Sequence, residues 1–178
     1  MNYGKIYSSP LGVINLRSDG EYLTGLWFDS SHDDKKHNKD YITGDLEIFK
    51  ETEKWLDIYF DGKEPDFCPK YKVIGETPFR KMVLDIMNKI PYGSLITYDD
   101  IAREIAKIKN IKKMSAQAVG GAVGFNPICI IIPCHRVIGK NGNLTGYGGG
   151  IQNKIKLLEL EGIDTSQYTI PKERVKNE

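Results

Sequence analysis

The sequence has no long apolar run and very few cysteines. Nothing among its 178 residues approaches the roughly 18 consecutive apolar residues of a transmembrane helix. The stretch MNYGKIYSSPLG lacks the apolar region of a secretory signal, so we expect no such signal. The three cysteines, Cys68, Cys129 and Cys134, are odd in number and show no CxxC spacing, which argues against a disulfide framework and a cysteine zinc cluster. These absences predict a protein of the reducing cytoplasm with no membrane partner.

Acidic residues are missing from one long part of the chain. Residues 105–158 contain eight lysines and arginines and no aspartate or glutamate, although the whole chain has a net charge of only +1. A long acid-free stretch is typical of a surface that contacts a polyanion, because each contact with a phosphate releases condensed counterions. The plainer interpretation is a solvated basic face.

The first 74 residues predict an antiparallel sheet followed by a helix. Apolar and polar residues alternate over residues 4–28 around a Ser-Pro-Leu-Gly turn and an Asp-Gly turn, which indicates a β-meander. Residues 30–45 are polar and charged, and we expect a solvated loop there. His32 and His37 lie in this loop with two aspartates, but a surface loop is a better interpretation than a metal site. Residues 46–59 repeat apolar residues at helical spacing and lead to an irregular linker over 63–76.

The second part of the chain predicts three helices. Thr77 and Pro78 are typical of a helix start, and Thr97 precedes two acidic residues in the first turn of another helix. The small-residue segment 115–125 follows, and together the last two helices form a helix-turn-helix pattern. Its glycine pair, Gly120 and Gly121, would cost about 1 kcal/mol each in an ordinary helix, so we expect another backbone to approach closely there.

The chemistry is concentrated at Cys134. Residues 128–132, ICIII, predict a buried strand in which Cys129 serves packing alone. Burial in an apolar wall would keep the Cys134 thiol inert, whereas the adjacent His135 and a glycine-rich loop favour a reactive thiol. Neighbouring side chains on an extended chain point to opposite faces, so proton transfer needs a bend or an intervening water. His135 also needs an orienting acceptor, for which Glu159 and Glu161 are both candidates.

These motifs closely resemble one family. PCHRVIG, with IPYGSLITY before it and GYGGG and NKIKLLELEG after it, is similar to the methylated-DNA–protein-cysteine methyltransferases, the O6-alkylguanine-DNA alkyltransferases. The likeness runs from about residue 6 to residue 163. It implies an α/β (α+β) fold, with an N-terminal antiparallel-sheet, ribonuclease H-like domain over residues 1–74. A mainly helical domain with the helix-turn-helix and the active-site cysteine would follow over 75–165, and then a tail over 166–178 that we expect to be partly ordered.

The resemblance also implies roles for individual residues. Cys134 would accept the alkyl group, His135 would deprotonate it through a water, Glu161 would orient His135, and Asn126 would brace the turn before the cysteine. The pocket for the extruded base would be formed by Tyr98, Val137, Tyr147 and Gly148, where the family often has serine at the last position. DNA would contact Gln117, Ala118, Gly121, Arg136, Lys112 and Lys113. The partner would be alkylated double-stranded DNA. The protein would act as a monomer without a cofactor, a metal or an obligate protein partner, and it would be associated with the nucleoid if the source is prokaryotic.

The chain departs from the family pattern at two places. Gln117 stands where the family usually has an arginine finger that fills the gap left by the flipped base. The connection over residues 107–114 is longer than usual and rich in lysine, which predicts phosphate contacts and a steep salt dependence. Two alternatives to alkyl transfer stay open: a lesion-recognition protein without efficient transfer, and a Cys-His-Glu hydrolase.

Overall fold

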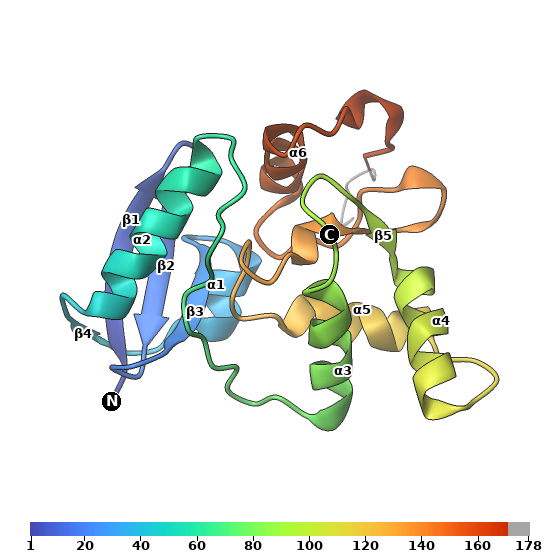
Figure 1. The fold of residues 1–178 in the computed structure, drawn as a ribbon, viewed down its shortest axis with the longest axis horizontal. Helices are drawn as coiled ribbons and strands as arrows, with labels where there is room; N and C mark the ends of the chain where they lie inside the picture. The colour runs from blue at the N-terminus through green and yellow to red at the C-terminus, as the bar shows by residue number, and fades with distance from the viewer. Residues whose placement is uncertain (171–178) are drawn as a thin grey trace, which may run out of the picture.

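The computed structural model describes residues 1–170, which form two lobes side by side (Figure 1). The N-terminal lobe holds a four-stranded sheet of β1 (Tyr3–Ser9), β2 (Gly12–Ser18), β3 (Leu23–Phe28) and β4 (Ile42–Thr43), in the order β3-β2-β1-β4. The first three strands pair antiparallel, which confirms the predicted meander, and β4 adds to β1 in parallel. Gly20 turns the chain between β2 and β3 with a φ of +111°, a conformation that favours glycine.

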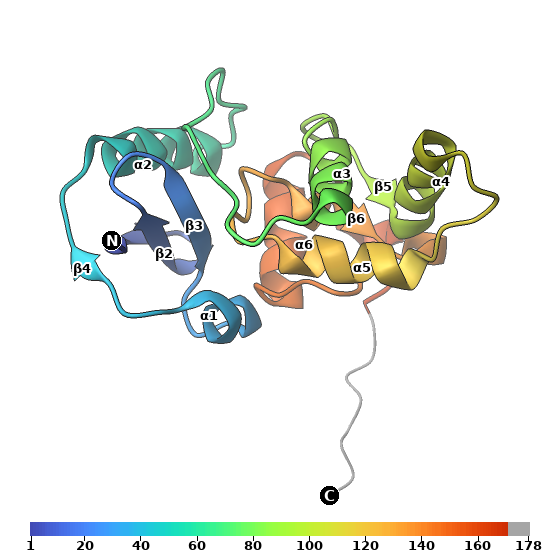
Figure 2. The ribbon, with the colours of Figure 1, turned by 90° about the horizontal axis from the view of Figure 1, so that it is seen from below.

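The helix α2 (Glu47–Phe60) confirms the helix predicted over residues 46–59. The helix lies against one face of the sheet (Figure 2), and Phe49, Leu56 and Tyr59 on its apolar stripe are completely buried. Its last turn therefore brings an aromatic hydroxyl, that of Tyr59, toward the second lobe.

The prediction of a solvated loop over residues 30–45 was wrong in its first part. Residues 32–37 form a short helix, α1 (His32–His37), because Ser31 caps it and two acidic residues lie in its first turn. Asp33 is only 3% exposed, and His37 is half-buried between Trp27 and Phe125. A short polar sequence was mistaken for a loop because its cap and its buried acid are not visible as apolar periodicity.

The C-terminal lobe consists of α3 (Pro78–Met87), α4 (Tyr98–Lys109), α5 (Ala116–Phe125) and α6 (Ile151–Leu160), with a small parallel sheet of β5 (Ile96–Thr97) and β6 (Val137–Ile138). The predicted caps are confirmed: Thr77 accepts a hydrogen bond from the amide of Arg80, and Thr97 forms a capping box with Asp100. Both α3 and α4 pack against α5, which completes the predicted helix-turn-helix. No helix within residues 1–170 is long and apolar enough to cross a membrane.

The predicted strand over residues 128–132 was also wrong. Only Ile128 pairs with a strand, as a single bridge to Leu26 at the edge of β3, and the chain then turns sharply. Ile130 has a φ of +70°, which is strained for a β-branched residue. Apolar composition alone cannot separate a buried strand from a buried turn, and here tertiary packing selects the turn.

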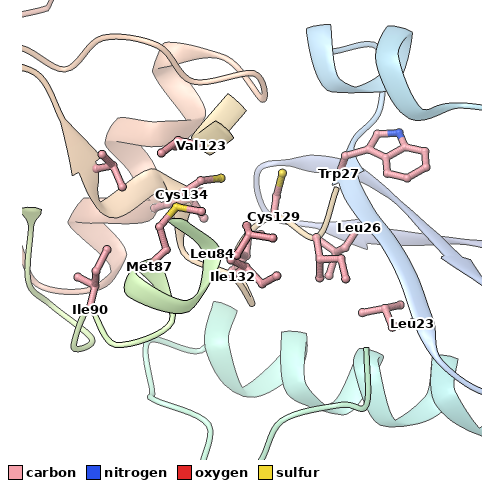
Figure 3. Packing of buried hydrophobic residues seen from close by; sticks show 14 of the residues in the cluster. Leu23, Leu26, Trp27, Leu84, Met87, Ile90, Val123, Cys129, Ile132 and Cys134 are labelled. Atoms are coloured by element: carbon pink, nitrogen blue, oxygen red, sulfur yellow. The ribbon is translucent and has the colours of Figure 1, made fainter. Parts of the chain in front are cut away.

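One apolar cluster runs through both lobes. Leu23, Leu26 and Trp27 of β3 approach Cys129 and other residues of the C-terminal lobe in Figure 3. Main-chain hydrogen bonds join the lobes as well, from Leu26 N to Pro127 O and from Cys129 N to Leu26 O, each at 2.8 Å. The first lobe therefore holds the turn before Cys134 in place. The domain limits at residues 74 and 165 remain predictions.

The beginning of the predicted tail is structured. A short 3-10 helix, η3 (Thr165–Gln167), leads to Thr169, whose amide donates to Gly142 O at 2.9 Å and whose carbonyl accepts from Leu144 N at 2.8 Å. Residues 171–178 of the tail lie outside the described residues.

Candidate functional site

The turn that carries Cys134 is braced by the side chain of Asn126. Its Nδ2 donates to Ile132 O at 2.8 Å, and its Oδ1 accepts from Ile128 N at 3.0 Å. Both ends of the turn are thus tied to one buried amide, which offsets part of the strain at Ile130. The resemblance implied this bracing of the turn by Asn126.

Cys134 begins a short 3-10 helix, η1 (Cys134–Arg136), and is 7% exposed. The pKa of Cys134 is lowered chiefly by the neighbouring thiol of Cys129, with contributions from Asn126 and from the charge of Lys154. These effects outweigh burial and the charge of Asp33, which act in the opposite direction. The direction of this shift favours a thiol that can ionise although it is buried.

The helical bend at Cys134 resolves the geometric problem posed by the adjacent histidine. His135 turns inward, and its Nε2 donates to Glu161 Oε2 at 2.5 Å. Its Nδ1 is buried and has no protein hydrogen-bond partner within residues 1–170. Burial lowers the pKa of His135, despite the neighbouring carboxylate. The imidazole is thus neutral, with the proton on Nε2 and a free acceptor at Nδ1.

Glu161 at the end of α6 is the acceptor for His135. It also accepts hydrogen bonds from Tyr59 Oη at 2.7 Å, Arg136 Nε at 2.7 Å and Gly93 N at 3.0 Å. Burial opposes ionisation of this carboxyl, but the hydrogen bonds that it accepts from His135 and Arg136, together with the charge of Arg136, prevail and lower its pKa to about 2. Glu161 is therefore ionised.

Glu159 is excluded as the orienting acid. It is exposed on α6 and accepts a hydrogen bond from Thr165 Oγ1 at 2.8 Å. Two residues along a helix point in different directions, so the pair of candidates is separated by backbone geometry alone.

Arg136 does not lie where a DNA contact was predicted. Its side chain is 11% exposed, and its guanidinium donates to Glu161 and, through Nη1, to Ile90 O at 2.9 Å. The adjacent Tyr92 ring lies 5.7 Å from Arg136 Cζ. Arg136 therefore binds Glu161 inside the protein, and one of the basic residues that we expected on the surface of the acid-free stretch is mostly buried.

A pocket of about 470 Å³ opens beside the helix-turn-helix. It is lined by Tyr98, Gln117, Gly120, Lys140, Thr145 and Gly146, among others. Tyr98 Oη donates to Thr145 O at 3.4 Å, and burial raises the pKa of Tyr98 to about 12. The pocket thus joins one residue predicted for the base with one predicted for DNA.

The outer face of α5 is open. Gln117, Ala118 and Gly121 are exposed there, and a Cβ added at Gly121 would meet no atom within 4 Å. The close backbone that we expected at Gly121 is therefore not part of residues 1–170, and the small residues leave room for a ligand. Lys112 and Lys113 lie exposed in the connection that precedes α5.

Lys154 of α6 was missed by sequence reasoning. It is completely buried, and its Nζ donates to Val137 O at 2.6 Å and to Thr145 O at 2.9 Å. Burial lowers the pKa of Lys154 to about 8. It links the predicted pocket residue Val137 to the loop that carries the other pocket residues. The sequence analysis counted it only among the eight basic residues of 105–158, as part of a candidate surface for a polyanion.

The loop after β6 places Tyr147 and Gly148 against the N-terminal lobe. The hydroxyl of Tyr147 is buried without a protein partner in the described part of the chain, and burial raises its pKa well above the ordinary value. Gly148 O accepts from Asp33 N at 3.2 Å, and a Cβ at residue 148 would overlap the Asp33 carboxylate. A side chain at position 148 would therefore have to displace the Asp33 carboxylate.

Asp33 and Tyr59 come from the N-terminal lobe, far from Cys134 in the sequence. No spacing signal linked them to the PCHRV motif. Among residues 1–170, no group of three or more histidine, cysteine, aspartate and glutamate side chains is arranged to hold a metal ion.

Two family models match the chain. Residues 2–68 match the ribonuclease-like domain of 6-O-methylguanine DNA methyltransferase, and residues 78–163 match its DNA binding domain. These matches agree with the predicted sheet-containing and helix-turn-helix lobes.

Individual relatives agree with the models. The methylated-DNA–protein-cysteine methyltransferase of Haemophilus influenzae is 38% identical over 164 residues, covering 90% of this chain and 87% of the relative. The corresponding protein of Methanosarcina acetivorans is 40% identical over 160 residues, covering 90% and 98%. The crystal structure of Mycobacterium tuberculosis OGT in complex with DNA superposes with a TM-score of 0.76 and 37% identity, covering 93% of this chain and 94% of that one. The chain belongs to the methylated-DNA–protein-cysteine methyltransferase family.

Proposed function

We propose that the protein repairs O6-alkylguanine in double-stranded DNA by moving the alkyl group to Cys134, with O4-alkylthymine as a second substrate to be tested. The observation that carries this proposal is the geometry at the turn: the buried Cys134 is followed by His135, whose Nε2 is held by Glu161 and whose Nδ1 has no protein partner within residues 1–170. This arrangement provides a nucleophile, a base and an orienting group in the order that activation of a thiol needs.

The chemical step follows from these positions. Cys134 loses its proton through a water to His135 Nδ1, and Glu161 stabilises the imidazolium that forms. The thiolate attacks the alkyl carbon, a C–S bond forms, the C–O6 bond breaks, and its electron pair leaves with guanine, which takes up a proton. The product is a thioether without a ready leaving group, so each protein molecule acts once. No cofactor takes part.

The reacting carbon of a stacked base is out of reach of a buried thiol, so the base must leave the helix. The pocket beside Tyr98 and Gly146 would receive it, and the open face of α5 with Gln117 would lie in the minor groove, where contacts need not depend on sequence. Lys112 and Lys113 would contact phosphates. Because Gln117 is shorter than the family's usual arginine and uncharged, these lysines would supply a large part of the affinity for DNA. The protein would bind DNA as a monomer, without an obligate protein partner.

The lesion-recognition alternative has one feature in its favour, the Gln117 position. The presence of Cys134 argues against it, since a protein that only recognises lesions has no need of an acceptor cysteine. The hydrolase alternative needs a direct Cys–His hydrogen bond, and the described residues contain none between Cys134 and His135.

The test is intact-protein mass spectrometry after incubation with a duplex that holds one O6-methylguanine, with Cys134→Ser as the matched control. We expect one methyl group per protein, located on Cys134 by peptide mapping, and none on the variant. Tight binding of the lesion without a mass change would refute transfer and support recognition alone. Binding measured against salt with Lys112→Ala and Lys113→Ala should give a slope smaller by about one per lysine.

A further inference from the structure

The hydroxyl of Tyr59 reaches the pair of His135 and Glu161 from the N-terminal lobe. Tyr59 lies in the last turn of α2 and is completely buried. Its Oη donates to Glu161 Oε2 at 2.7 Å and lies 3.4 Å from His135 Nε2. The other groups that donate to Glu161 in the described part of the chain all belong to the C-terminal lobe: Gly93 N, His135 Nε2 and Arg136 Nε. Tyr59 thus connects the N-terminal lobe to the group that orients His135.

Two of these donors share one oxygen. Glu161 Oε2 accepts from Tyr59 Oη and from His135 Nε2, the second at 2.5 Å, whereas Arg136 and Gly93 donate to Oε1. Two donors on one carboxylate oxygen weaken each other, because both draw on the same electron density. The bond from Tyr59 therefore limits how strongly Glu161 can stabilise a second proton on His135.

The Tyr59 hydroxyl is held in this direction by aromatic neighbours. Its ring stacks on Trp55, with the ring centroids 5.4 Å apart, and meets Phe60 and Tyr92 edge-on at 5.5 and 6.3 Å. Burial and the charge of Glu161 raise the pKa of Tyr59 well above the ordinary value, so the hydroxyl keeps its proton. Tyr59 is therefore a fixed donor at every pH at which His135 titrates.

We propose that Tyr59 is a positioning residue, which holds Glu161 Oε2 toward His135 and keeps the imidazole neutral until the thiol proton arrives. The proposal rests on the alkyl transfer by Cys134 proposed above. A neutral imidazole is needed because a base that is already protonated cannot accept a proton. The hydroxyl stabilises the carboxylate most while the imidazole is neutral, since an imidazolium would itself compensate the charge of Glu161. Tyr59 acts through Glu161 rather than on the reacting atoms.

Several other groups act on the same imidazole. The titratable and charged groups around His135 and its partner are Tyr59 of α2, Tyr92 before β5, Cys134 and Arg136 of η1, and Lys154 and Glu161 of α6. Burial has the largest effect on the pKa of His135 and lowers it, Glu161 raises it, and the charges of Arg136 and Lys154 lower it. A change confined to the Tyr59 hydroxyl leaves these groups in place, so a shift in the titration of His135 reports that hydroxyl.

The test is the titration of His135 by NMR in protein labelled with 15N in its histidine rings. The chain has three histidines, and the spectrum of His135→Asn assigns the signal. Tyr59→Phe removes the hydroxyl and keeps the ring. We expect the midpoint of His135 to rise by roughly 0.5–1 pH unit, a part of the one to two units that a hydrogen bond to a charged group is worth. The Nε2 proton should also shift downfield, because its bond to Glu161 strengthens when the competing donor is gone.

Two further proteins make this result specific. 3-Fluorotyrosine at position 59, introduced by suppression of a stop codon, keeps the hydroxyl and makes it a stronger donor, so the midpoint of His135 should fall. Tyr7→Phe is the matched control, because it removes another tyrosine-to-carboxylate hydrogen bond, from Tyr7 Oη to Asp57 Oδ1 at 2.6 Å between β1 and α2. It should leave the midpoint unchanged. Opposite shifts from two changes at position 59 cannot come from damage to the fold.

The same shift should appear in methyl transfer from O6-methylguanine. With Tyr59→Phe, the acid limb of the pH profile of the transfer rate should move upward, while the amplitude stays at one methyl group per protein molecule. A shifted midpoint of His135 with an unmoved acid limb would overturn the role of Tyr59 in transfer.

Unchanged midpoints in both proteins altered at position 59, or shifts in the same direction, would overturn the positioning role outright. If Tyr59→Phe does not fold, an unchanged or raised midpoint in the fluorotyrosine protein overturns it alone. The NMR titration needs no DNA, so its outcome is separate from that of the proposed function. Opposite shifts without any methyl uptake would keep the coupling of Tyr59 to His135 and refute alkyl transfer.

Discussion

Replacing Glu161 with glutamine tests the buried network behind the nucleophile. The carboxylate accepts hydrogen bonds from Tyr59, Gly93, His135 and Arg136, two on each oxygen. A glutamine amide accepts through one oxygen, so in either orientation its NH2 group faces two donors. The Arg136 guanidinium also loses its counter-ion while it remains mostly buried.

The cost can be worked from the pKa. Glu161 has a pKa of about 2 instead of 4.5, which corresponds to roughly 3 kcal/mol of stability at neutral pH. Removal of one partner from a buried ion pair typically costs 3–5 kcal/mol, so the two estimates agree on about 3–4 kcal/mol. For a chain of this size we expect the melting temperature to fall by roughly 10 °C.

The sign of the pH dependence makes the test specific. Because the folded pKa is depressed, the contribution of Glu161 is complete above about pH 4.5 and is lost as the pH falls toward about 2. Urea unfolding of the parent and Glu161→Gln should therefore differ by about 3–4 kcal/mol at pH 7 and by less than half of that at pH 3. Glu159→Gln, exposed on the same helix, is the matched control and should change stability by less than about 0.5 kcal/mol. An equally stable Glu161→Gln, or a pH-independent difference, would refute this reasoning.

Three further predictions concern the same site. Lys154→Met removes the donor of two buried carbonyls and should slow methyl transfer by about tenfold. Because the pKa of Lys154 is lowered, the parent should gain stability relative to this variant between about pH 8 and 10.5, measured by urea unfolding. Gly148→Ser should destabilise the fold by about 1–3 kcal/mol, and Asp33→Ala should relieve that cost in the double variant; additive costs would contradict the overlap. Asn126→Ala should cost about 2–5 kcal/mol and speed amide hydrogen exchange at residues 128–132, whereas unchanged protection would show that the turn does not depend on it.

The sequence predicted those parts of the fold that depend on local signals. The meander, α2 and the capped starts of α3 and α4 follow from alternation, helical spacing and capping residues, which act over a few positions. The prediction of a strand for ICIII was wrong because the conformation of this segment is set by Asn126 and by pairing with β3. An apolar, isoleucine-rich run has the same composition in a strand and in a buried turn. The helix α1 was not predicted because a polar cap and one buried acidic residue produce no apolar periodicity in the sequence.

The site followed the same division. Cys134, His135 and Glu161 lie within one motif-rich region, and the bend at η1 brings His135 and Glu161 together as the resemblance implied. Asp33 and Tyr59 reach the site only through packing of the two lobes, so no spacing in the sequence could reveal them. Arg136 was misplaced because a cation in an acid-free stretch looks like a DNA contact until its partner, 25 residues away, is seen.

The most direct test of the central claim is a rapid-quench time course with limiting protein and an excess of duplex that carries labelled O6-methylguanine. We predict a single burst whose amplitude equals one methyl group per protein molecule, with all label on Cys134 and no further demethylation. Continued turnover beyond that amplitude, or label on another residue, would contradict a thiol that is activated once and spent.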